Sequence, residues 1–421
     1  MFPLILSLIT TIFWLLSKPD FATITNNPLL SLSQLFSLIG TILLSYTFIL
    51  SSRFNFLEKI FGSLDTIYKK HHLSGALAFL LLISHPILLA LNAFQSSSSA
   101  KVYLLPSTNL IYSTGVLALY SLIISLTFTL LVKLPYHLWF KTHQLMGIVL
   151  PLALIHTLFI NSDISRSPLL KIWIIAWILI ASIAYLYKRF FYANHGPKVL
   201  YQVDNLENIN GLLDLSLSPI NNSLKYYPGQ FIFISFEQNG ITTEFHPFTI
   251  ASSPNSKNLR LCLKVVSNYT ASLIDLKRGT KATILGPYGH LYKAFETNKN
   301  LILIAGGIGI TPFMSMIETE IVNQKNRQLN LFYSTKSIDS AFNNFRFTSL
   351  STQNNNFKYY PVFTDKNPRL SAKYIQKRCS NFLSSNIIIC GPQIMIADLK
   401  NQLTYLNVKS QNIFIEDFSL N

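Results

Sequence analysis

The sequence predicts a membrane-embedded α-helical bundle followed by two soluble lobes, an antiparallel β-barrel and a parallel α/β layer. Half of the 421 residues are hydrophobic and only 12% are charged, which is about half the charged share of an ordinary soluble domain. The long apolar runs are confined to residues 1–190. From residue 196 onward, short β-rich segments alternate with Gly and Pro turns, as in small barrels and α/β layers.

Six apolar runs of roughly membrane-spanning length predict the helical bundle. They cover residues 1–17, 29–51, 71–95, 109–132, 138–161 and 168–187. The first run is interpreted as a membrane helix rather than a signal peptide, because no Lys or Arg precedes it and no small-residue cleavage site is clear. We therefore expect six transmembrane helices within residues 1–190.

Lys and Arg residues predict the orientation of this bundle. They are concentrated in every second loop, beside the apolar runs. The cations in these loops are Arg53, Lys59, Lys69, Lys70, Lys133, Lys141, Lys188, Arg189 and Lys198. Loops rich in Lys and Arg stay on the cytoplasmic side, so we expect a multi-pass protein of the inner or plasma membrane with a cytoplasmic C-terminal half. The formal net charge of +16 is assigned to contact with membrane lipid, and no nucleic-acid partner is expected.

Cysteine use is sparse. Cys262, Cys379 and Cys390 include no CxxC pair, which argues against a zinc site or a disulfide framework. All three lie in the C-terminal half, so this half is expected in a reducing compartment.

Four histidines lie inside two of the apolar runs, where ionisable residues are rare and usually functional. His71 and His85 are separated by 14 positions, which returns an α-helix to within roughly 40° of the same face, about 21 Å further along its axis. His143 and His156 are separated by 13 positions, which leaves the two rings about 140° apart on a straight helix. Pro151 lies between them, and we expect a kink there that brings both rings to one side.

The predicted topology pairs these histidines in depth. His71 and His143 lie toward the cytoplasmic ends of antiparallel runs, and His85 and His156 lie toward the outer ends. Iron with two imidazole ligands is a low-spin electron-transfer heme, so the four residues are predicted to ligate two b-type hemes stacked across the bilayer. The alternative, isolated polar residues bonded to neighbouring helices, leaves the matched depths unexplained. A di-metal site is disfavoured because these runs contain no carboxylates.

His72 is an alternative inner ligand. Its spacing of 13 positions to His85 places it on a different face of the helix. Gly75 and Gly147 follow the inner histidines by one turn, and the missing side chains there would let a flat porphyrin approach the backbone.

Residues 196–296 are predicted to form a small antiparallel barrel. Short apolar segments with Gly or Pro turns occur at 228–236 (PGQFIFISF), 246–254 (HPFTIASSP), 260–266 (RLCLKVV) and 285–291 (LGPYGHL). Short strands at such spacing are typical of barrels.

Residues 297–421 are predicted to form the parallel α/β layer. Residues 300–312 (NLILIAGGIGITP) indicate a buried strand, a Gly-rich turn and the start of a helix, and further strands are expected at 330–337 and 386–392. The three glycines of this turn would let a diphosphate approach the backbone at the positive end of the helix. Thr311 is expected to cap this helix and Pro312 to occupy its first turn.

Taken in chain order, the motifs HHLSG with a later His, TH with a later His, HPFT, GPYG, GGIGITP and CGP resemble the ferric reductase and NADPH oxidase superfamily over nearly the whole chain. Members of that superfamily join a six-helix heme domain to a ferredoxin-reductase-like flavin and nicotinamide unit. The resemblance implies a ferric-reductase-like transmembrane di-heme domain at residues 1–190, an FAD-binding β-barrel domain at 196–296 and an NAD(P)-binding α/β domain at 297–421.

The resemblance also implies site residues. The HPFT segment would line the isoalloxazine of FAD, and the NYT turn with a neighbouring lysine would approach its pyrophosphate; these residues are His246, Pro247, Phe248, Thr249, Lys264, Asn268 and Thr270. The Gly-rich loop would cradle the nicotinamide dinucleotide, and the CGP segment would lie beside the nicotinamide ring; these residues are Gly306, Gly307, Gly309, Thr311, Pro312, Gly391 and Pro392. Cys390 is the catalytic candidate beside the ring, although a small core residue at a strand end is an equal alternative.

Lys336 favours NADPH over NADH. NAD-selective sites often place Asp or Glu at the end of the second strand, on the ribose 2′-hydroxyl. Here that strand ends in Ser334, Thr335, Lys336 and Ser337, where a cation and hydroxyls suit a 2′-phosphate. Asp339 lies close by and argues for NADH.

The C-terminal tail departs from the superfamily pattern. Many members end in an aromatic residue stacked on the flavin, whereas this chain ends IEDFSLN. If Phe418 keeps the family register, Leu420 occupies the stacking position, where an aliphatic cover would be displaced more easily by nicotinamide. The alternative is that the tail does not lie at the flavin.

These features together imply a flavocytochrome oxidoreductase. Hydride would pass from NADPH or NADH to FAD, and single electrons would then pass through the inner and outer hemes to an acceptor on the outer face. Dioxygen, giving superoxide, is the preferred acceptor, because the compact single-chain layout resembles bacterial NADPH-oxidase-like proteins. Reduction of a ferric chelate and electron donation to an extracytoplasmic partner protein are the alternatives.

Overall fold

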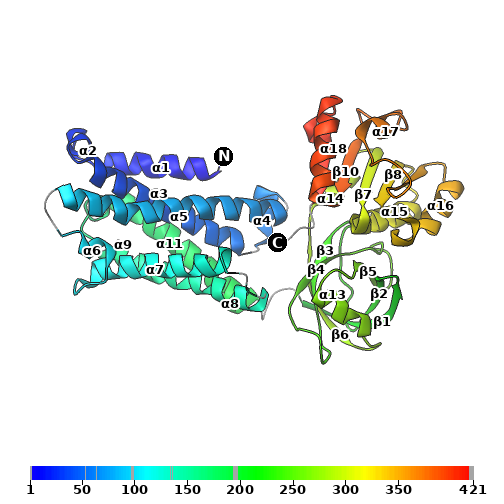
Figure 1. Cartoon of the computed structure of the whole chain (residues 1–421), viewed down its shortest axis with the longest axis horizontal. Coiled ribbons are helices and arrows are strands. Elements are labelled where there is room, and N and C mark those ends of the chain that lie inside the picture. The colour runs from blue at the N-terminus through cyan, green and yellow to red at the C-terminus, as the bar shows by residue number, and fades with distance from the viewer. Residues whose placement is uncertain are drawn as a thin grey trace. The chain divides into compact units, whose positions relative to one another are not determined.

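The computed structural model describes residues 2–52, 54–62, 64–95, 99–132, 134, 136–192 and 198–416. The chain separates into two compact units, Met1–His195 and Gly196–Asn421 (Figure 1).

Unit 1 is a bundle of helices. These are α1 (Phe2–Leu16), α2 (Ala22–Asn26), α3 (Pro28–Ser51), α4 (Asn55–Phe61), α5 (Leu64–Gln95), α6 (Lys101–Leu104), α7 (Leu110–Leu130), α8 (Tyr136–Gln144), α9 (Val149–Phe159), α10 (Asp163–Arg166) and α11 (Pro168–Leu186). The bundle core lies between α3, α5, α9 and α11 and contains Leu38, Ile42, Ala78, Leu150 and Ile174.

Within the described residues, five helical segments are long and apolar enough to cross a membrane. They are Pro28–Ser51, Thr66–Gln95, Leu110–Leu130, Leu138–Phe159 and Pro168–Phe191, and they correspond to the second to sixth predicted runs. The first run forms α1, whose 15 residues span about 22 Å, less than the roughly 30 Å of a hydrocarbon core. Pro19 and the charged residues Lys18 and Asp20 follow the end of this helix.

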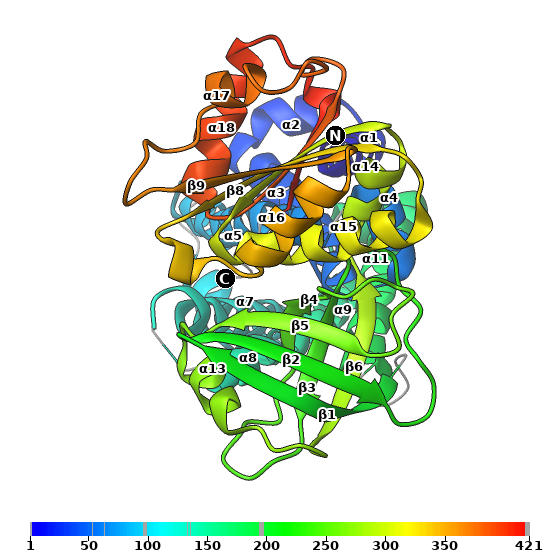
Figure 2. The same cartoon turned by 90° about the vertical axis from the view of Figure 1, so that its right-hand side faces the viewer.

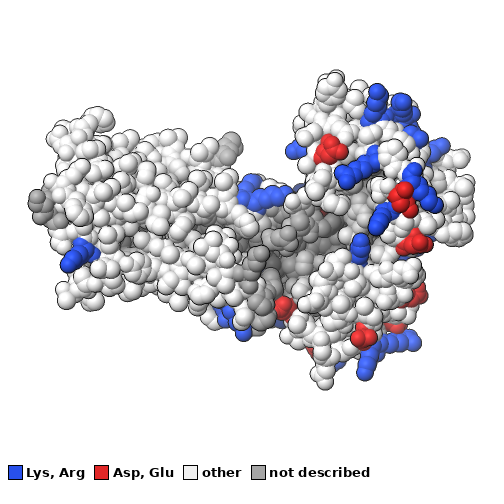
Figure 3. Space-filling view, in the orientation of Figure 1, with Lys and Arg blue, Asp and Glu red and all other residues white. Residues whose placement is uncertain are grey.

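The outer surface of unit 1 is apolar, as expected of a bundle that faces lipid. Leu80, Leu110, Leu130, Ile172 and Ile183 expose more than half of their surface. On the face drawn in Figure 3 this unit carries few Lys, Arg, Asp or Glu residues, whereas unit 2 carries many. The contrast reproduces the change in composition near residue 190.

The fifth apolar run is not one continuous α-helix. It consists of α8, a 3-10 helix over Leu145–Ile148 and α9. The expected distortion therefore precedes Pro151 instead of centring on it. Because Pro151 lies in the first turn of α9, its missing N–H removes no bond that the helix requires.

Unit 2 begins with a curled antiparallel sheet. Its strands are β1 (Lys198–Ile209), β2 (Leu212–Pro219), β3 (Phe231–Phe236), β4 (His246–Thr249), β5 (Leu259–Lys264) and β6 (Lys281–Tyr288). They lie in the order β4-β3-β6-β1-β2-β5, and a bridge between Ile250 and Leu261 joins the two edges. The sheet therefore closes on itself as a small barrel around an apolar core (Figure 2).

The second lobe of unit 2 is a five-stranded parallel sheet in the order β11-β10-β7-β8-β9. Its strands are β7 (Asn300–Gly306), β8 (Gln328–Thr335), β9 (Phe357–Phe363), β10 (Asn386–Cys390) and β11 (Ile413–Glu416). The helices are α14 (Leu291–Glu296), α15 (Thr311–Asn323), α16 (Asn344–Gln353), α17 (Ala372–Gln376) and α18 (Gln393–Tyr405). α15 and α16 cover one face of the sheet, and α17 and α18 cover the other (Figure 2).

Glycines bring the ends of β7 and β10 into direct contact. A Cβ at Gly309 would lie 2.3 Å from the carbonyl oxygen of Cys390, and one at Gly306 would lie 2.8 Å from Pro392 Cδ. The backbone of the Gly-rich loop therefore rests directly on the chain that leaves β10. A side chain at Gly309 would separate the two strand ends.

We predict that Gly309→Ala destabilises unit 2 by about 3 kcal/mol, because the new methyl group meets a backbone carbonyl that cannot move aside. Gly307→Ala is the control. No described atom lies within 4 Å of a Cβ at Gly307, and the substitution acts only through its positive φ of 55°, at about 1 kcal/mol. Thermal unfolding in detergent measures both variants. Equal losses, or a larger loss for Gly307→Ala, would contradict the packing argument.

Candidate functional site

The structure brings the inner pair of histidines together. His71 comes from α5 and His143 from α8, and their ring centroids lie 6.3 Å apart. Two metal–nitrogen bonds of about 2 Å each, with roughly 1 Å from each nitrogen to its ring centre, give a separation of roughly 6 Å for two imidazoles on one metal. The spacing of these rings therefore suits one metal ion between them. His72, the alternative inner ligand, is exposed on the same helix, and its ring centroid lies 5.8 Å from that of His71.

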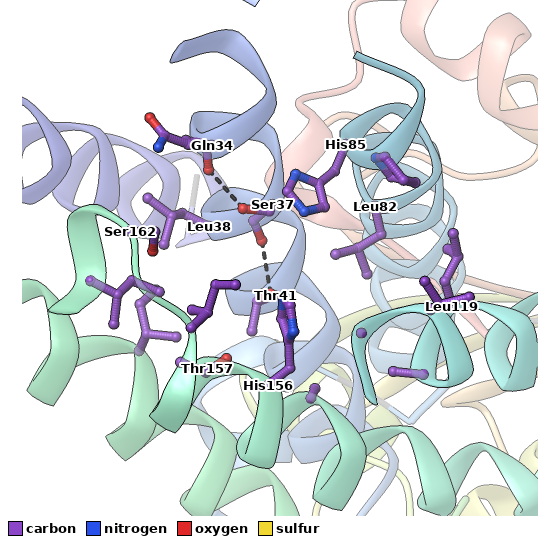
Figure 4. A pocket seen from close by; sticks show the side chains of 18 of the residues that line it. Gln34, Ser37, Leu38, Thr41, Leu82, His85, Leu119, His156, Thr157 and Ser162 are labelled. Atoms are coloured by element: carbon purple, nitrogen blue, oxygen red, sulfur yellow. Dashed lines mark hydrogen bonds between the residues drawn. The ribbon is translucent and has the colours of Figure 1, made fainter. Parts of the chain in front are cut away.

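The outer pair shares one cavity. His85 from α5 and His156 from α9 both line a cavity of about 240 Å³ in the bundle, and Figure 4 shows their side chains entering it from opposite sides. Ser37 and Thr41 of α3 line the same space. The two depths predicted from the sequence are therefore occupied by one histidine pair each.

Two of the histidines are fixed by backbone carbonyls through Nδ1. His71 Nδ1 lies 3.0 Å from the carbonyl oxygen of Thr47, and His156 Nδ1 lies 2.8 Å from that of Ile111. A carbonyl can only accept, so each Nδ1 carries the proton. The lone pair of each ring is therefore on Nε2, the atom free to bind a metal.

His85 and His143 reach the same protonation state beside hydroxyl groups of neighbouring helices, and His85, like His71 and His156, donates to a backbone carbonyl. Ser33 Oγ donates to the carbonyl of His85, so His85 Nδ1 donates to Ser33, whose carbonyl oxygen lies 3.0 Å away. Thr129 Oγ1 donates to the carbonyl of Ser125 and lies 3.2 Å from His143 Nδ1, which donates to it. Trp139 stacks on the His143 ring at 5.3 Å and 8°. All four rings thus suit b-type heme iron with two axial imidazoles.

The 3-10 segment explains how His143 and His156 come to one side. Its four residues turn about 120° each instead of about 100°, which adds roughly 80° and reduces the offset of the two rings from about 140° to roughly 60°. Gly147 lies in this segment, and its role differs from the expected approach of a porphyrin. A Cβ there would lie 2.2 Å from the Tyr185 ring, whose hydroxyl donates to the carbonyl of Gln144. Gly147 therefore makes room for α11.

The HPFT segment forms β4, and Tyr269 joins it to the NYT turn. The ring centroids of His246 and Tyr269 are stacked 3.5 Å apart, and the Phe248 ring lies nearly parallel to that of Tyr269 at 6.4 Å. Burial lowers the pKa of His246 to about 4, so its ring is neutral near pH 7. Pro247 is half-buried, and Thr249 is buried where β4 pairs with Phe231.

The NYT turn forms α13 (Asn268–Ser272). Thr270 is buried, and its hydroxyl accepts the N–H groups of Val266 and Ser267 in a capping box. The Thr270 hydroxyl therefore makes its hydrogen bonds within the local turn. Asn268 and Lys264 are exposed beside it.

The Gly-rich loop forms a 3-10 helix over Gly307–Ile310 before α15. Gly307 is the glycine with an open face and a positive φ, because Gly306 and Gly309 are packed against the β10 end. Thr311 does not cap α15 from outside, contrary to the expectation. It already lies in the first helical turn, and its hydroxyl donates to the carbonyl of Ile308.

The CGP segment follows β10 and touches the Gly-rich loop. Cys390 is fully buried, and burial raises the pKa of its thiol well above the ordinary value, so the sulfur is not a thiolate. A Cβ at Gly391 would lie 3.1 Å from the Cα of Gly306. Pro392 is exposed and immediately precedes α18. The two motifs expected at the nicotinamide therefore form one surface.

Lys336 is exposed immediately after the C-terminal end of β8, and Asp339 is exposed in the 3-10 helix that follows. The structure thus places both charges at the end of the second strand of the parallel layer, where the coenzyme preference was expected to be set. Leu420 and Phe418 lie outside the described residues.

The loop that follows the HPFT strand is tied to α15. Ser315 Oγ donates to the carbonyl of Ser252 at 2.6 Å, and Thr319 bonds Ser253 at 3.1 Å. Glu318 accepts from Ser253 N–H and pairs with Arg346 at 2.8 Å. These contacts hold the barrel strand and the nucleotide-loop helix in a fixed relation.

Several residues of the site carry no signal in the sequence. Ser33 and Thr129 fix histidine tautomers from other helices, and Tyr269 stacks on His246. Gly115 of α7 lies under His156, because a Cβ there would lie 2.8 Å from His156 Cε1 and Nδ1. Small and hydroxylic residues are common in membrane helices for packing alone, so only the structure distinguishes these.

We predict that Gly115→Ala displaces the His156 ring and removes up to one heme per chain. The new methyl group would overlap the ring at 2.8 Å, and an imidazole turned from its bond to Ile111 loses its orientation. Leu117→Ala is the control, since Leu117 is on the same helix and 44% exposed to the surroundings. The heme-to-protein ratio is measured in purified samples of both variants, and only Gly115→Ala should lower it. Full heme content in Gly115→Ala would contradict the geometry.

Three family models match the chain in order. "Ferric reductase like transmembrane component" matches residues 36–154, "FAD-binding domain" matches 199–300, and "Oxidoreductase NAD-binding domain" matches 303–401.

The curated relatives match between 34% and 51% of this chain. The chain is 31% identical over 180 residues to a subunit of the Na(+)-translocating NADH-quinone reductase of Pseudoalteromonas atlantica, covering 40% of this chain and 43% of that protein. It is 26% identical over 235 residues to a heavy chain of the superoxide-generating NADPH oxidase of Dictyostelium discoideum, covering 51% and 32%. The chain spans about half or less of the length of such relatives.

Among solved structures, a flavohemoglobin from Malassezia yamatoensis with bound FAD and heme matches with a TM-score of 0.53 at 17% identity, covering 94% of this chain and 97% of that one. At this identity the likeness shows a shared fold. The ordered family matches carry the assignment: the chain has the architecture of the ferric reductase and NADPH oxidase superfamily, a ferric-reductase-like transmembrane component followed by FAD- and NAD-binding domains.

Proposed function

We propose that the chain is a transmembrane oxidoreductase that moves electrons from cytosolic NADPH or NADH to an acceptor on the outer face of the membrane, with dioxygen, reduced to superoxide, as the preferred acceptor. The observation that carries the proposal is the set of four Nδ1 hydrogen bonds, which leave four Nε2 atoms available at two depths of one bundle. The FAD- and NAD-binding domains that follow supply the donor side.

The cofactors would supply the redox chemistry: FAD accepts a hydride and releases single electrons, and b-type hemes carry single electrons. His71 and His143 would hold the inner heme, and His85 and His156 the outer one. The rings keep their orientation through fixed acceptors, so the protein contributes spacing and exclusion of water. The lipid-facing apolar surface insulates this route from the solvent.

In unit 2 we assign the flavin to the β4 strand with Tyr269 and the dinucleotide to the Gly-rich loop. The open backbone of Gly307 would face the diphosphate of a dinucleotide, and the contact between Gly309 and Cys390 holds the two loop ends together. The hydrogen bond from Ser315 to the Ser252 carbonyl holds the loop after β4 at a fixed distance from α15. Hydride transfer requires such a fixed distance between donor and acceptor.

The charges at the outer end of unit 1 favour a small neutral acceptor. Asp163 and Arg166, which could serve a ferric chelate, are paired with each other, and the Asp163 side chain is only 2% exposed. A negatively charged chelate would compete with Asp163 for Arg166, whereas dioxygen needs no charged partner, which supports dioxygen over ferric iron.

The test is a reduced-minus-oxidised visible spectrum of the purified protein in detergent, recorded without oxygen after NADPH and then NADH. We expect a b-type signal of about two hemes per chain with FAD, reduced by NADPH. Admission of oxygen should then reduce cytochrome c in a manner that superoxide dismutase abolishes. A folded, flavin-loaded sample without heme absorbance would refute the proposal. Ferric reduction insensitive to the dismutase would indicate a ferric reductase, and slow oxygen turnover accelerated by a partner would indicate a protein that donates electrons to that partner.

We further predict that Lys336→Glu raises the KM for NADPH at least tenfold and changes the KM for NADH much less, because a carboxylate at the end of β8 repels a 2′-phosphate and suits a 2′-hydroxyl. Lys358→Glu makes the same charge change at the opposite end of the sheet, at the start of β9, and should leave both values unchanged. Steady-state kinetics with both coenzymes measure this. An equal effect of Lys336→Glu on the two coenzymes would refute the assignment.

A further inference from the structure

An arginine of the barrel connects the two lobes of unit 2. Arg260 lies on β5, and its guanidinium makes a bidentate contact with the carboxylate of Asp214 on β2, with 2.7 Å between Nε and Oδ1. Its Nη2 also donates to Oδ1 of Asn343, the residue before α16, at 3.3 Å (Figure 2). The Arg260 side chain is 22% exposed. One planar guanidinium therefore links two barrel strands to the start of a helix in the parallel lobe.

Asn343 uses its side chain for this contact instead of for its own helix. An Asn at the N-cap position usually accepts a hydrogen bond from an N–H group of the first helical turn. The Asn343 side chain makes no such capping bond, and its backbone has a φ of 53°. The start of α16 is thus bonded to the barrel, and this bond requires Arg260 to keep its position.

The contact lies at the end of the segment that carries Lys336. Residues 336–343 form the specificity segment, which runs from the end of β8 to the start of α16. At its beginning, the carbonyl of Lys336 accepts from the N–H of Asp365 at 3.0 Å. Near its end, the N–H of the buried Phe342 donates to the Tyr333 hydroxyl at 3.2 Å. The specificity segment is therefore attached at both ends, and Arg260 is the attachment that comes from the barrel.

The charges around Arg260 balance, which favours a positional role over an electrostatic one. Arg260 Nη1 lies 3.7 Å from the Glu318 carboxylate of α15, and Glu318 pairs with Arg346 of α16 at 2.8 Å. With Asp214, the described residues of this cluster are two cations and two carboxylates. A balanced cluster contributes little net potential to a phosphate outside it. An effect of Arg260 on coenzyme binding would therefore arise from the position of the specificity segment.

We propose that Arg260 is a positioning residue for the coenzyme: through Asn343 it fixes the specificity segment where Lys336 meets the 2′-phosphate of NADPH, so that the barrel takes part in coenzyme selection. This inference rests on the proposed function, because it requires the assignment of Lys336 to the 2′-phosphate. NADH presents a 2′-hydroxyl at this point, which makes a weaker bond than a charged phosphate does. NADH binding therefore depends less on the position of the segment.

The experiment measures the KM for NADPH and for NADH with the full-length protein in detergent, with ferricyanide taking electrons from the reduced flavin. We expect Arg260→Met and Asn343→Gly to raise the KM for NADPH about fivefold and to leave the KM for NADH within about twofold. Glycine tolerates the positive φ of Asn343, so Asn343→Gly removes the side chain without straining the backbone. Arg278→Met is the control and should change neither value, since it removes another barrel arginine that is paired with an aspartate, Asp204 of β1.

Asp214→Asn separates position from charge. Its amide nitrogen cannot accept a hydrogen bond from the guanidinium, so Arg260 loses the bidentate contact and the KM for NADPH should rise. A cluster that acted through its electrostatic field would give the opposite sign, because loss of a negative charge favours a 2′-phosphate. In a Lys336→Met background, Asn343→Gly should have no further effect on the KM for NADPH, since the segment then has no cation to position.

A lower KM for NADPH in Asp214→Asn, equal changes for the two coenzymes, or an unchanged KM in Asn343→Gly would overturn the inference and leave the assignment of Lys336 intact. An undiminished effect of Asn343→Gly in the Lys336→Met background would overturn it as well. If Arg260→Met does not fold, as judged by its bound FAD, Asp214→Asn and Asn343→Gly decide the matter. A Lys336→Met variant that keeps the wild-type ratio of the two KM values refutes the proposed role of Lys336, and this inference with it.

Discussion

Unit 1 depends on one kind of interaction, the hydrogen bond that the Nδ1–H of each of the four paired histidines donates to an acceptor on a neighbouring helix. A polar group without a partner in hydrocarbon costs several kcal/mol, so a histidine in a membrane span is stable only where such an acceptor exists. The acceptors of His71 and His85 belong to α3, and those of His143 and His156 belong to α7. The bonds that orient the rings therefore also fix how α5 packs on α3 and how the fifth span packs on α7.

Composition and periodicity predicted the membrane unit well, because length and apolarity determine which segments can enter lipid. Five of the expected spans are helices of sufficient length, whereas α1 is shorter. The pairing of histidines by depth followed from spacing and topology alone. Their acceptors could not be predicted, because the rotation of α3 and α7 about their axes has no clear signal when nearly every residue is apolar. The rotation that aligns His156 with His143 came from a 3-10 segment, which the position of Pro151 only approximated.

In unit 2, too, some features could be predicted from the sequence and others could not. The alternation of strands, turns and helices predicted the barrel and the parallel layer, since each has a local pattern. The glycines of the Gly-rich loop have different roles, which depend on contacts distant in sequence. Gly309 allows close contact with the Cys390 backbone, while Gly307 has an open face. Thr311 entered the helix because the 3-10 turn before it begins the helical path early. Tyr269 joined β4 through packing that no motif records.

The Tyr185 hydroxyl on the carbonyl of Gln144 has a mechanical consequence. This hydrogen bond joins α11 to Gln144, the last residue of α8, which directly follows His143. The Tyr185 ring fills the space that a side chain at Gly147 would occupy. α11 continues as a π-helix over Tyr187–Tyr192, the segment through which the chain leaves the membrane. Torque on that exit segment would turn α11 and, through this phenol, tilt the segment that bears His143. The joint thus connects the π-helical exit segment mechanically to the segment that bears His143.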